Sequence, residues 1–158
     1  MFLVTGATGL LGNSVVRELL RRGEGVRVYV RGSAPREELA GLDVEVFSGE
    51  LEDRASLERA ASGCRAVIHS AAMIHIGYTR LDDARRANVQ GTANVVAVCR
   101  QLGCRLVYVS TVDTLPAALS ASQPLDEGGT GVGKTVCTYV VSKREAEAEV
   151  TAACTAGL

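Results

Sequence analysis

Short apolar runs rich in β-branched residues alternate with longer amphipathic segments along the whole chain. The short runs are typical of buried strands, and we expect five of them, at residues 2–4, 26–30, 44–47, 66–68 and 106–109. The longer segments repeat apolar residues at spacings of three and four, which predicts helices at residues 11–22, 55–61, 81–101 and 138–155. Because this alternation requires crossover connections between parallel strands, we predict an α/β fold, a doubly wound parallel sheet with helices on both faces. For residues 32–42 the sequence fits either a short helix or an irregular crossover, and we leave the choice open.

The composition fits one globular domain. The chain has 158 residues, of which 47% are hydrophobic. Its 17 Lys and Arg nearly balance 18 Asp and Glu, without a basic run, so we expect no nucleic-acid or membrane partner. The five cysteines show no C-x-x-C pair and no zinc-ligand spacing, and no apolar stretch is long enough to cross a membrane. We therefore expect buried free thiols, a cytoplasmic location and no metal site.

The segment after the first predicted strand, T-G-A-T-G-L-L-G at residues 5–12, opens the first predicted helix. Its first glycine permits a tight turn, its second lets backbone N–H groups approach a pyrophosphate, and its third lets the helix pack close to the strand. The phosphates would lie at the positive end of the helix. The flanking strand and helix favour this interpretation over a purely structural glycine turn. The predicted cofactor contacts in this segment are Gly6, Thr8, Gly9, Leu10, Leu11 and Gly12.

Arg31 follows the second predicted strand. Dinucleotide folds that prefer NAD usually have Asp or Glu at this point, which binds the ribose 2′-hydroxyl. An arginine would instead pair with a 2′-phosphate, so we predict NADP as the cofactor, with NAD as the alternative. The competing interpretation of Arg31 is a solvated charge at a strand end.

Tyr139 and Lys143 lie four residues apart in the last predicted helix. Together with the glycine segment and the motifs at residues 69–72, 88–92 and 109–111, this pair resembles the extended short-chain dehydrogenase/reductase family. That family contains nucleotide-sugar epimerases and dehydratases, dihydroflavonol reductases and 3β-hydroxysteroid dehydrogenases. The resemblance covers the whole chain in order and implies a Rossmann-type NAD(P)-binding domain at residues 1–158. Because the family's chains continue well beyond this length, it also implies a piece of a longer enzyme without its C-terminal substrate domain.

The resemblance implies a role for each residue of the site. Tyr139 would be the general acid or base, Lys143 would hold the nicotinamide ribose, and Thr111 would donate a hydrogen bond to the substrate oxygen. Residues four apart share a helix face, so the Lys143 ammonium should favour the phenolate and lower the pKa of Tyr139. Further cofactor contacts implied by matching positions are Glu50, Leu51, Ala71 and Ala72.

Several positions depart from the family pattern or stay open. Glu50 stands where an Asp is usual, and Thr111 where Ser is commoner. For Asn88 we weigh bonding of local backbone against a relay or helix-kinking role. We expect His69 to bond backbone at the strand end, and His75 to line the substrate entrance or a loop.

Residues 128–135 match the G-x-x-x-x-G-K-T pattern of a phosphate-binding P-loop. Such a loop needs a buried strand before it and a helix that begins at its Lys-Thr, and the flanking sequence predicts neither. We therefore interpret residues 115–138 as a long surface loop, with a lid beside the active site as one role, rather than as a nucleotide hydrolysis site.

The most economical function is hydride transfer between a nicotinamide cofactor and a carbonyl or alcohol on a small-molecule substrate. Two alternatives stay open: a nucleotide-sugar epimerase or dehydratase with bound NAD, and a cofactor-sensing NADP-binding module without catalysis. The resemblance also implies a homodimer packed through the helices that bear Asn88 and Tyr139.

Overall fold

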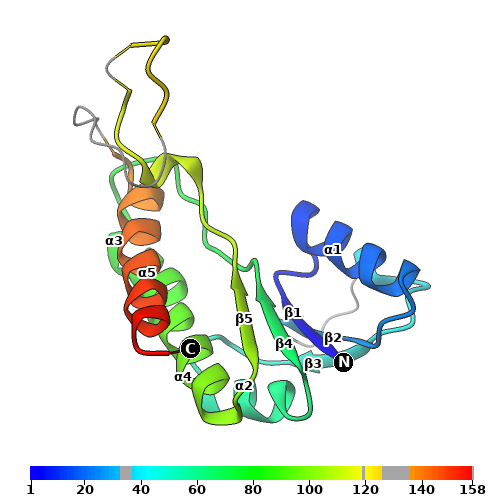
Figure 1. Ribbon diagram of the computed structural model, residues 1–158. Helices are drawn as coiled ribbons and strands as arrows, with labels where there is room; N and C mark the ends of the chain where they lie inside the picture. Colours follow the sequence, from blue (N-terminus) through cyan, green and yellow to red (C-terminus); the bar gives the residue numbers. More distant parts are fainter. Residues whose placement is uncertain (33–36, 119, 126–135, 158) are drawn as a thin grey trace.

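A single sheet of five parallel strands runs through the centre of the computed structural model, which describes residues 1–32, 37–118, 120–125 and 136–157 (Figure 1). The strand order is β3-β2-β1-β4-β5. The strands are β1 (Phe2–Thr5), β2 (Val26–Val30), β3 (Glu45–Ser48), β4 (Ala66–His69) and β5 (Arg105–Tyr108). Each begins and ends within one residue of its predicted range, so the predicted parallel sheet is confirmed.

Helices cover the sheet in two layers. They are α1 (Leu10–Arg21), α2 (Arg54–Ala61), α3 (Leu81–Ala84), α4 (Gly91–Leu102) and α5 (Thr138–Thr155). On one face Val4 of β1 packs in a core with Val16 of α1, and on the other Leu3 packs with Leu57 of α2 and Val95 of α4. Because successive residues of a strand point to opposite faces, β1 is buried on both sides. The doubly wound arrangement is therefore confirmed for the centre of the sheet.

The edge strand β5 departs from the prediction that helices cover both faces. Val107 pairs in register with Ile68 of β4, yet Val107 is 46% exposed. α1 packs against β1 and β2, so its layer stops short of this edge. β5 is therefore covered on one face only.

The predicted single helix at residues 81–101 is interrupted in the middle. Between α3 and α4 the backbone forms a π-helical turn at Arg85–Gln90, which contains Asn88. The helical course continues, but the hydrogen-bond register widens for six residues. Side-chain periodicity carries no information on that register, which is why a regular helix was the wrong prediction here. In the segment left open, Glu37–Leu39 form a short 3-10 turn.

Cys64, Cys99 and Cys104 are buried, as expected of structural thiols, whereas Cys137 is half-buried and Cys154 exposed. No helix in the described ranges combines the length and the apolar character that crossing a membrane requires. Nor do the described His, Cys, Asp and Glu side chains gather into a group of three that could hold a metal ion.

Candidate active site

The carboxyl ends of the parallel strands lie at one edge of the sheet, and the predicted site residues follow them there. These residues are Gly6 to Gly12 after β1, Arg31 after β2, Glu50 and Leu51 after β3, Ala71 and Ala72 after β4, and Thr111 after β5. From β1 the chain crosses over to β2, and from β4 it crosses over to β5 on the other side of the sheet. The loops after β1 and β4 therefore lead away from each other. Open α/β sheets bind ligands in the crevice formed at such a point.

The glycine segment turns tightly and touches the loop after β4. Gly6 has a φ of +72°, a left-handed conformation that favours glycine, and its carbonyl oxygen accepts a hydrogen bond from the Gly9 N–H at 3.0 Å. A Cβ atom on Gly6 would lie 2.6 Å from the nitrogen of Ala71, and one on Gly12 would lie 2.2 Å from the Gly6 oxygen. The Ala71 N–H in turn donates to Thr5 Oγ1 at 3.3 Å. The two loops therefore form one floor, which has no room for a side chain at either glycine.

α1 begins directly on this floor. Gly9 is its N-cap, no side chain caps the helix, and the first turn has no acidic residue. The first N–H groups of a helix lack intrahelical partners and carry partial positive charge. Leu10 is 91% exposed and Leu11 51%, so neither side chain is used by the core. The start of α1 fits the pyrophosphate of a dinucleotide, because no side chain caps its first N–H groups and no acidic side chain in the first turn would repel a phosphate.

The ends of β2 and β3 supply the residues expected on the adenosine side. Arg31 and Glu50 are both exposed and follow neighbouring strands. Tyr29 Oη donates to the Glu50 carbonyl oxygen at 2.9 Å, which holds the backbone here. Leu51 packs so closely on Gly91 that a Cβ there would lie 2.9 Å from the Leu51 Cβ. The backbone is thus held in place while the Arg31 and Glu50 side chains stay at the surface.

Thr111 and Tyr139 are brought together from β5 and α5. Thr111 precedes the 3-10 turn Val112–Thr114, where its Oγ1 accepts from the Asp113 N–H at 3.3 Å. Burial raises the pKa of the Tyr139 hydroxyl above its usual value, and the nearby Thr111 side chain opposes that rise. The Tyr139 hydroxyl is therefore protonated at neutral pH and stands beside a second hydroxyl.

Lys143 lies one turn beyond Tyr139 and is only 3% exposed. Its Nζ donates to the Val109 carbonyl oxygen at 2.8 Å and lies 4.1 Å from the centroid of the Tyr108 ring. Burial lowers the pKa of Lys143 to about 8, and the nearby Glu147 carboxylate opposes the change. The expected lowering of the Tyr139 pKa is wrong for this arrangement. The ammonium is directed to Val109 and Tyr108, and burial dominates at the tyrosine.

Asn88 connects three parts of the site, a role left open by the sequence. Its Oδ1 accepts from the Met73 N–H at 2.7 Å, while its Nδ2 donates to the Met73 carbonyl at 3.0 Å and to Ser142 Oγ at 2.9 Å. Ser142 Oγ donates to the Tyr139 carbonyl oxygen at 2.9 Å. Asn88 is 1% exposed and Ser142 is fully buried. The amide therefore fixes the loop after β4 and the first turns of α5 to the π-helical turn, instead of bonding local backbone.

The loop after β4 also supplies backbone acceptors to the start of α5. The N–H of Thr138 donates to the Gly77 carbonyl at 2.7 Å, and that of Tyr139 donates to the His75 carbonyl at 3.3 Å. Thr138 Oγ1 donates to the Thr79 carbonyl at 2.8 Å. These contacts satisfy orphan donors of the helix, and they put His75 in a loop, one of its two expected positions. Residues 73–79 are referred to below as the 73–79 segment.

His69 forms a buried chain with two threonines. Its Nδ1 lies 2.7 Å from Thr5 Oγ1 and its Nε2 lies 3.1 Å from Thr92 Oγ1. Burial, with the Lys143 charge as a smaller cause, lowers the pKa of His69 to about 3. Our expectation that His69 bonds backbone is wrong: the neutral ring joins β4 to Thr5 and to α4 through hydroxyl groups.

The P-loop pattern at residues 128–135 lies outside the described residues. In the described stretch before it, residues 120–125, the pairing is confined to an isolated bridge between Ser120 and Gln123. A P-loop follows a buried strand, and this stretch does not form one.

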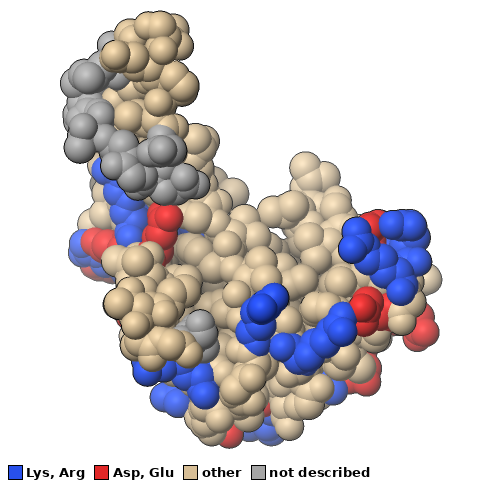
Figure 2. All heavy atoms as spheres, viewed as in Figure 1, with Lys and Arg blue, Asp and Glu red and all other residues tan. Residues whose placement is uncertain are grey.

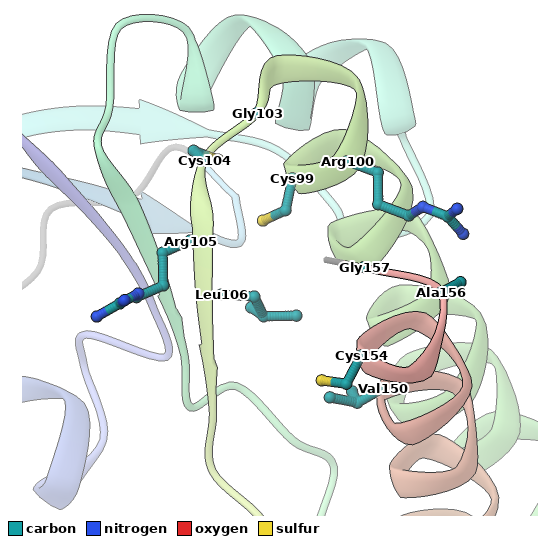
Figure 3. Close-up of a pocket in the computed structure, with 10 residues that line it drawn as sticks. All are labelled: Cys99, Arg100, Gly103, Cys104, Arg105, Leu106, Val150, Cys154, Ala156 and Gly157. Atoms are coloured by element: carbon teal, nitrogen blue, oxygen red, sulfur yellow. The ribbon is translucent and has the colours of Figure 1, made fainter.

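A pocket of about 560 Å³ lies away from the predicted site (Figure 3). It is formed by the last turns of α4 and α5 and the first residues of β5, with Cys99, Leu106, Val150 and Cys154 among its lining residues. This is the amino end of β5, opposite to the edge where the glycine segment and Tyr139 lie. The pocket therefore takes no part in the site described above.

The chain matches the model of the NAD dependent epimerase/dehydratase family over residues 2–157. It is 32% identical over 157 residues to a putative dihydroflavonol 4-reductase from Synechocystis, covering 99% of this chain and 46% of that protein. It is 35% identical over 158 residues to the 2-alkyl-3-oxoalkanoate reductase of Stenotrophomonas maltophilia, covering 99% of this chain and 47% of that protein. The chain thus spans about half the length of these relatives.

Solved structures give the same result. The Bordetella bronchiseptica enzyme WbmG, in complex with NAD and UDP, is 26% identical with a TM-score of 0.80, covering 95% of this chain and 48% of that one. The parallel sheet, with strand order β3-β2-β1-β4-β5, agrees with that likeness of fold. The chain belongs to the NAD-dependent epimerase/dehydratase family, the extended short-chain dehydrogenases/reductases, and has their Rossmann-type parallel sheet.

Proposed function

We propose that residues 1–158 form the NAD(P)-binding domain of an oxidoreductase that interconverts a carbonyl and an alcohol on a small-molecule substrate. The observation that carries this proposal is that the side chains of Tyr139 and Thr111 lie close together, at the same sheet edge as the glycine segment. A buried lysine, Lys143, lies one helical turn away. A proton donor, a second hydroxyl and a cation beside a dinucleotide site are the groups that carbonyl reduction needs.

Each group has a distinct task in the reaction. When bound, the cofactor supplies or accepts the hydride. Thr111 and Tyr139 donate hydrogen bonds to the substrate oxygen, and the Tyr139 proton passes to that oxygen as the carbonyl becomes an alcohol. The proton then returns to Tyr139 from solvent. Because burial keeps Tyr139 protonated at neutral pH, its hydroxyl is in the state that a general acid requires.

The residues proposed to hold the cofactor are distributed over the loops at this edge. The glycine segment would bind the pyrophosphate on its backbone, and Lys143 the nicotinamide ribose. Glu50 and Leu51 would lie beside the adenine, with Ala71 and Ala72 along the floor. Arg31 at the end of β2 supports NADP over NAD, because a guanidinium pairs with a 2′-phosphate in a bidentate manner.

Titration with NADPH and NADH tests the cofactor preference. We expect NADPH to bind about tenfold or more tightly than NADH, and Arg31→Ser to remove most of that difference, since an exposed phosphate pair contributes about 1–2 kcal/mol. Arg17→Ser, which changes another exposed arginine, is the matched control. Tighter binding of NADH by the unaltered chain would contradict the assignment of Arg31.

The catalytic proposal is tested with Tyr139→Phe, which removes one hydroxyl. Turnover of an identified substrate should fall at least a hundredfold while NADPH affinity stays within about twofold. Thr151→Val removes a hydroxyl from an exposed residue near the far end of the same helix and should leave turnover unchanged. Full activity of Tyr139→Phe would refute the general-acid role.

Two other functions make different predictions. An epimerase or dehydratase of the WbmG kind, whose structure contains NAD and UDP, should hold NAD tightly and bind UDP. A cofactor-sensing module should bind NADPH but show no turnover, and it gives no reason for Thr111, Tyr139 and Lys143 to be together.

A homodimer through the helices bearing Asn88 and Tyr139 stays a prediction, which analytical ultracentrifugation tests. A cytoplasmic location also stays a prediction.

A further inference from the structure

The 73–79 segment exposes an unusual row of apolar side chains. Ile74 is 68% exposed, Ile76 77% and Tyr78 76%, whereas the residues between them are half-buried. The Gly77 N–H donates to the His75 carbonyl oxygen at 3.1 Å, so the chain turns tightly at Ile76. The segment presents its large apolar side chains outward while His75 and Gly77 are half-buried.

This row is held next to the reacting groups. The Tyr139 N–H donates to the carbonyl of His75, which lies between Ile74 and Ile76, and the Thr138 N–H donates to Gly77, which precedes Tyr78. Asn88 fixes Met73 at the other end of the segment. The apolar row is therefore attached by its backbone to the turn of α5 that carries Tyr139.

A further exposed apolar side chain, that of Val112, lies next to Thr111. Val112 directly follows Thr111 and is 77% exposed. The Thr111 side chain lies near that of Tyr139, so exposed apolar residues adjoin both Thr111 and the backbone of Tyr139. Large apolar side chains left exposed in a group commonly mark a binding surface.

The same surroundings are poor in positive charge. Residues 70–79 contain no Lys, Arg, Asp or Glu, and residues 106–118 contain only Asp113. Arg80, which directly follows the segment, pairs with Asp83 at 3.1 Å. The arginines on neighbouring elements are also engaged: Arg85 binds Glu145, and Arg144 donates to the carbonyls of Thr114 and Leu115. Figure 2 shows the hollow between α1 and the α5 side of the molecule lined by uncharged atoms on this face.

We propose that the 73–79 segment and Val112 form the wall of a substrate site for a ketone or secondary alcohol with an apolar body, rather than for a nucleotide sugar. The inference rests on the proposed function and specifies its substrate class. An uncharged aliphatic or alicyclic body would lie on Ile74, Ile76 and Tyr78 with its oxygen at Tyr139 and Thr111. A diphosphate would find no free cation on this wall.

Direct binding to the NADPH-loaded chain tests this inference without requiring turnover. The probes are trans-1-decalone, an alicyclic ketone, and UDP-glucose, with dissociation constants measured by ligand-detected NMR. We expect decalone to bind more tightly than UDP-glucose, and Ile76→Ser to weaken decalone about tenfold, because each buried aliphatic side chain contributes about one decade of affinity. Ile74→Ser should have a similar effect. Val46→Ser removes a side chain that is 54% exposed on the edge strand β3 and should change nothing.

The outcomes separate the two proposals. If NADPH binds and decalone affinity is the same in the Ile76→Ser, Ile74→Ser and unaltered chains, the wall is wrong while the oxidoreductase proposal stands. Tighter binding of UDP-glucose than of decalone also overturns the wall. If Ile76→Ser instead converts a dimer to a monomer in sedimentation, with decalone affinity unchanged, the row is an interface between copies. Failure of the chain to bind NADPH at all contradicts the proposed function itself.

Discussion

The two sides of the site differ in what shapes them: backbone on the side of β1, and buried side chains on the side of α5. On the β1 side, the glycine segment is shaped by backbone and by the absence of side chains, since a Cβ on Gly12 would lie 2.2 Å from the Gly6 oxygen. On the α5 side, the positions of Tyr139 and Lys143 depend on buried polar side chains, above all Asn88 and Ser142. A backbone-built site tolerates almost no added atom, whereas a side-chain-built site tolerates no lost hydrogen bond. Substitutions that add a methyl group on one side and remove an amide on the other separate these two behaviours.

The largest effect is expected for Gly12→Ala. The added methyl group collides with backbone atoms, which cannot move aside as a side chain can, so NADPH affinity should fall more than about a hundredfold, and stability by about 1–3 kcal/mol. Gly25→Ala is the matched control, because the closest atom to its Cβ would be the end of the flexible Met1 side chain, at 3.3 Å. NADPH fluorescence titration and urea denaturation measure the two quantities. Unchanged NADPH affinity in Gly12→Ala would show that the backbone around Gly6 can move to make room for the methyl group.

Asn88→Ala should destabilise the chain by about 2–4 kcal/mol, because it leaves the Met73 N–H and carbonyl and the Ser142 hydroxyl without this partner in a buried setting. Asn94→Ala is the control: Asn94 Nδ2 donates to the Leu51 and Glu52 carbonyls at a less buried position, and its loss should cost about 1 kcal/mol. The midpoint of urea unfolding reports both. Equal losses would mean that the α5 side does not depend on Asn88 in particular.

His69 is an exception to this contrast, because it forms a buried side-chain network with Thr5 and Thr92 on the β1 side of the site. Its pKa is lowered from 6.5 to about 3 in the folded chain, so the unfolded chain takes up the proton first as the pH falls. Stability should be full above pH 6.5 and decrease from there towards pH 3, with a loss of about 2 kcal/mol at pH 5. Urea unfolding at several pH values measures this slope. His69→Asn should flatten the slope and His75→Asn should not; an unchanged slope in His69→Asn assigns it to other groups.

The smallest effect concerns the Lys143 charge. Because burial lowers its pKa to about 8, the ammonium is present below that pH and is lost as the pH rises through it. If Lys143 holds the nicotinamide ribose, NADPH affinity should weaken about three- to tenfold between pH 7 and pH 9. Lys143→Met should bind weakly at both pH values, with a flat profile. A flat profile in the unaltered chain would remove Lys143 from the cofactor site.

The backbone-built side was predictable from sequence, and the side-chain-built side was predictable only in part. Gly6, Gly9 and Gly12 stand at fixed offsets, and a local turn needs only those offsets and the flanking strand and helix. Tyr139 and Lys143 were found by their spacing of four together with the ordered motifs along the chain, but the direction of the Lys143 ammonium towards Val109 depends on a segment more than thirty residues away. The exposed row in the 73–79 segment had a signal, an alternation of apolar residues, that was too short to read as a strand.

The sequence by itself determined the sheet, because hydrophobic periodicity, glycine stops and crossover geometry act within short stretches of chain. It also determined which residue types meet at the carboxyl edge, since every strand of a parallel sheet ends there. Only the tertiary structure decided the π-helical turn around Asn88, the neutral state of His69 and the raised pKa of Tyr139. These depend on burial and on hydrogen-bond partners that come from distant segments, and a linear pattern carries no record of either.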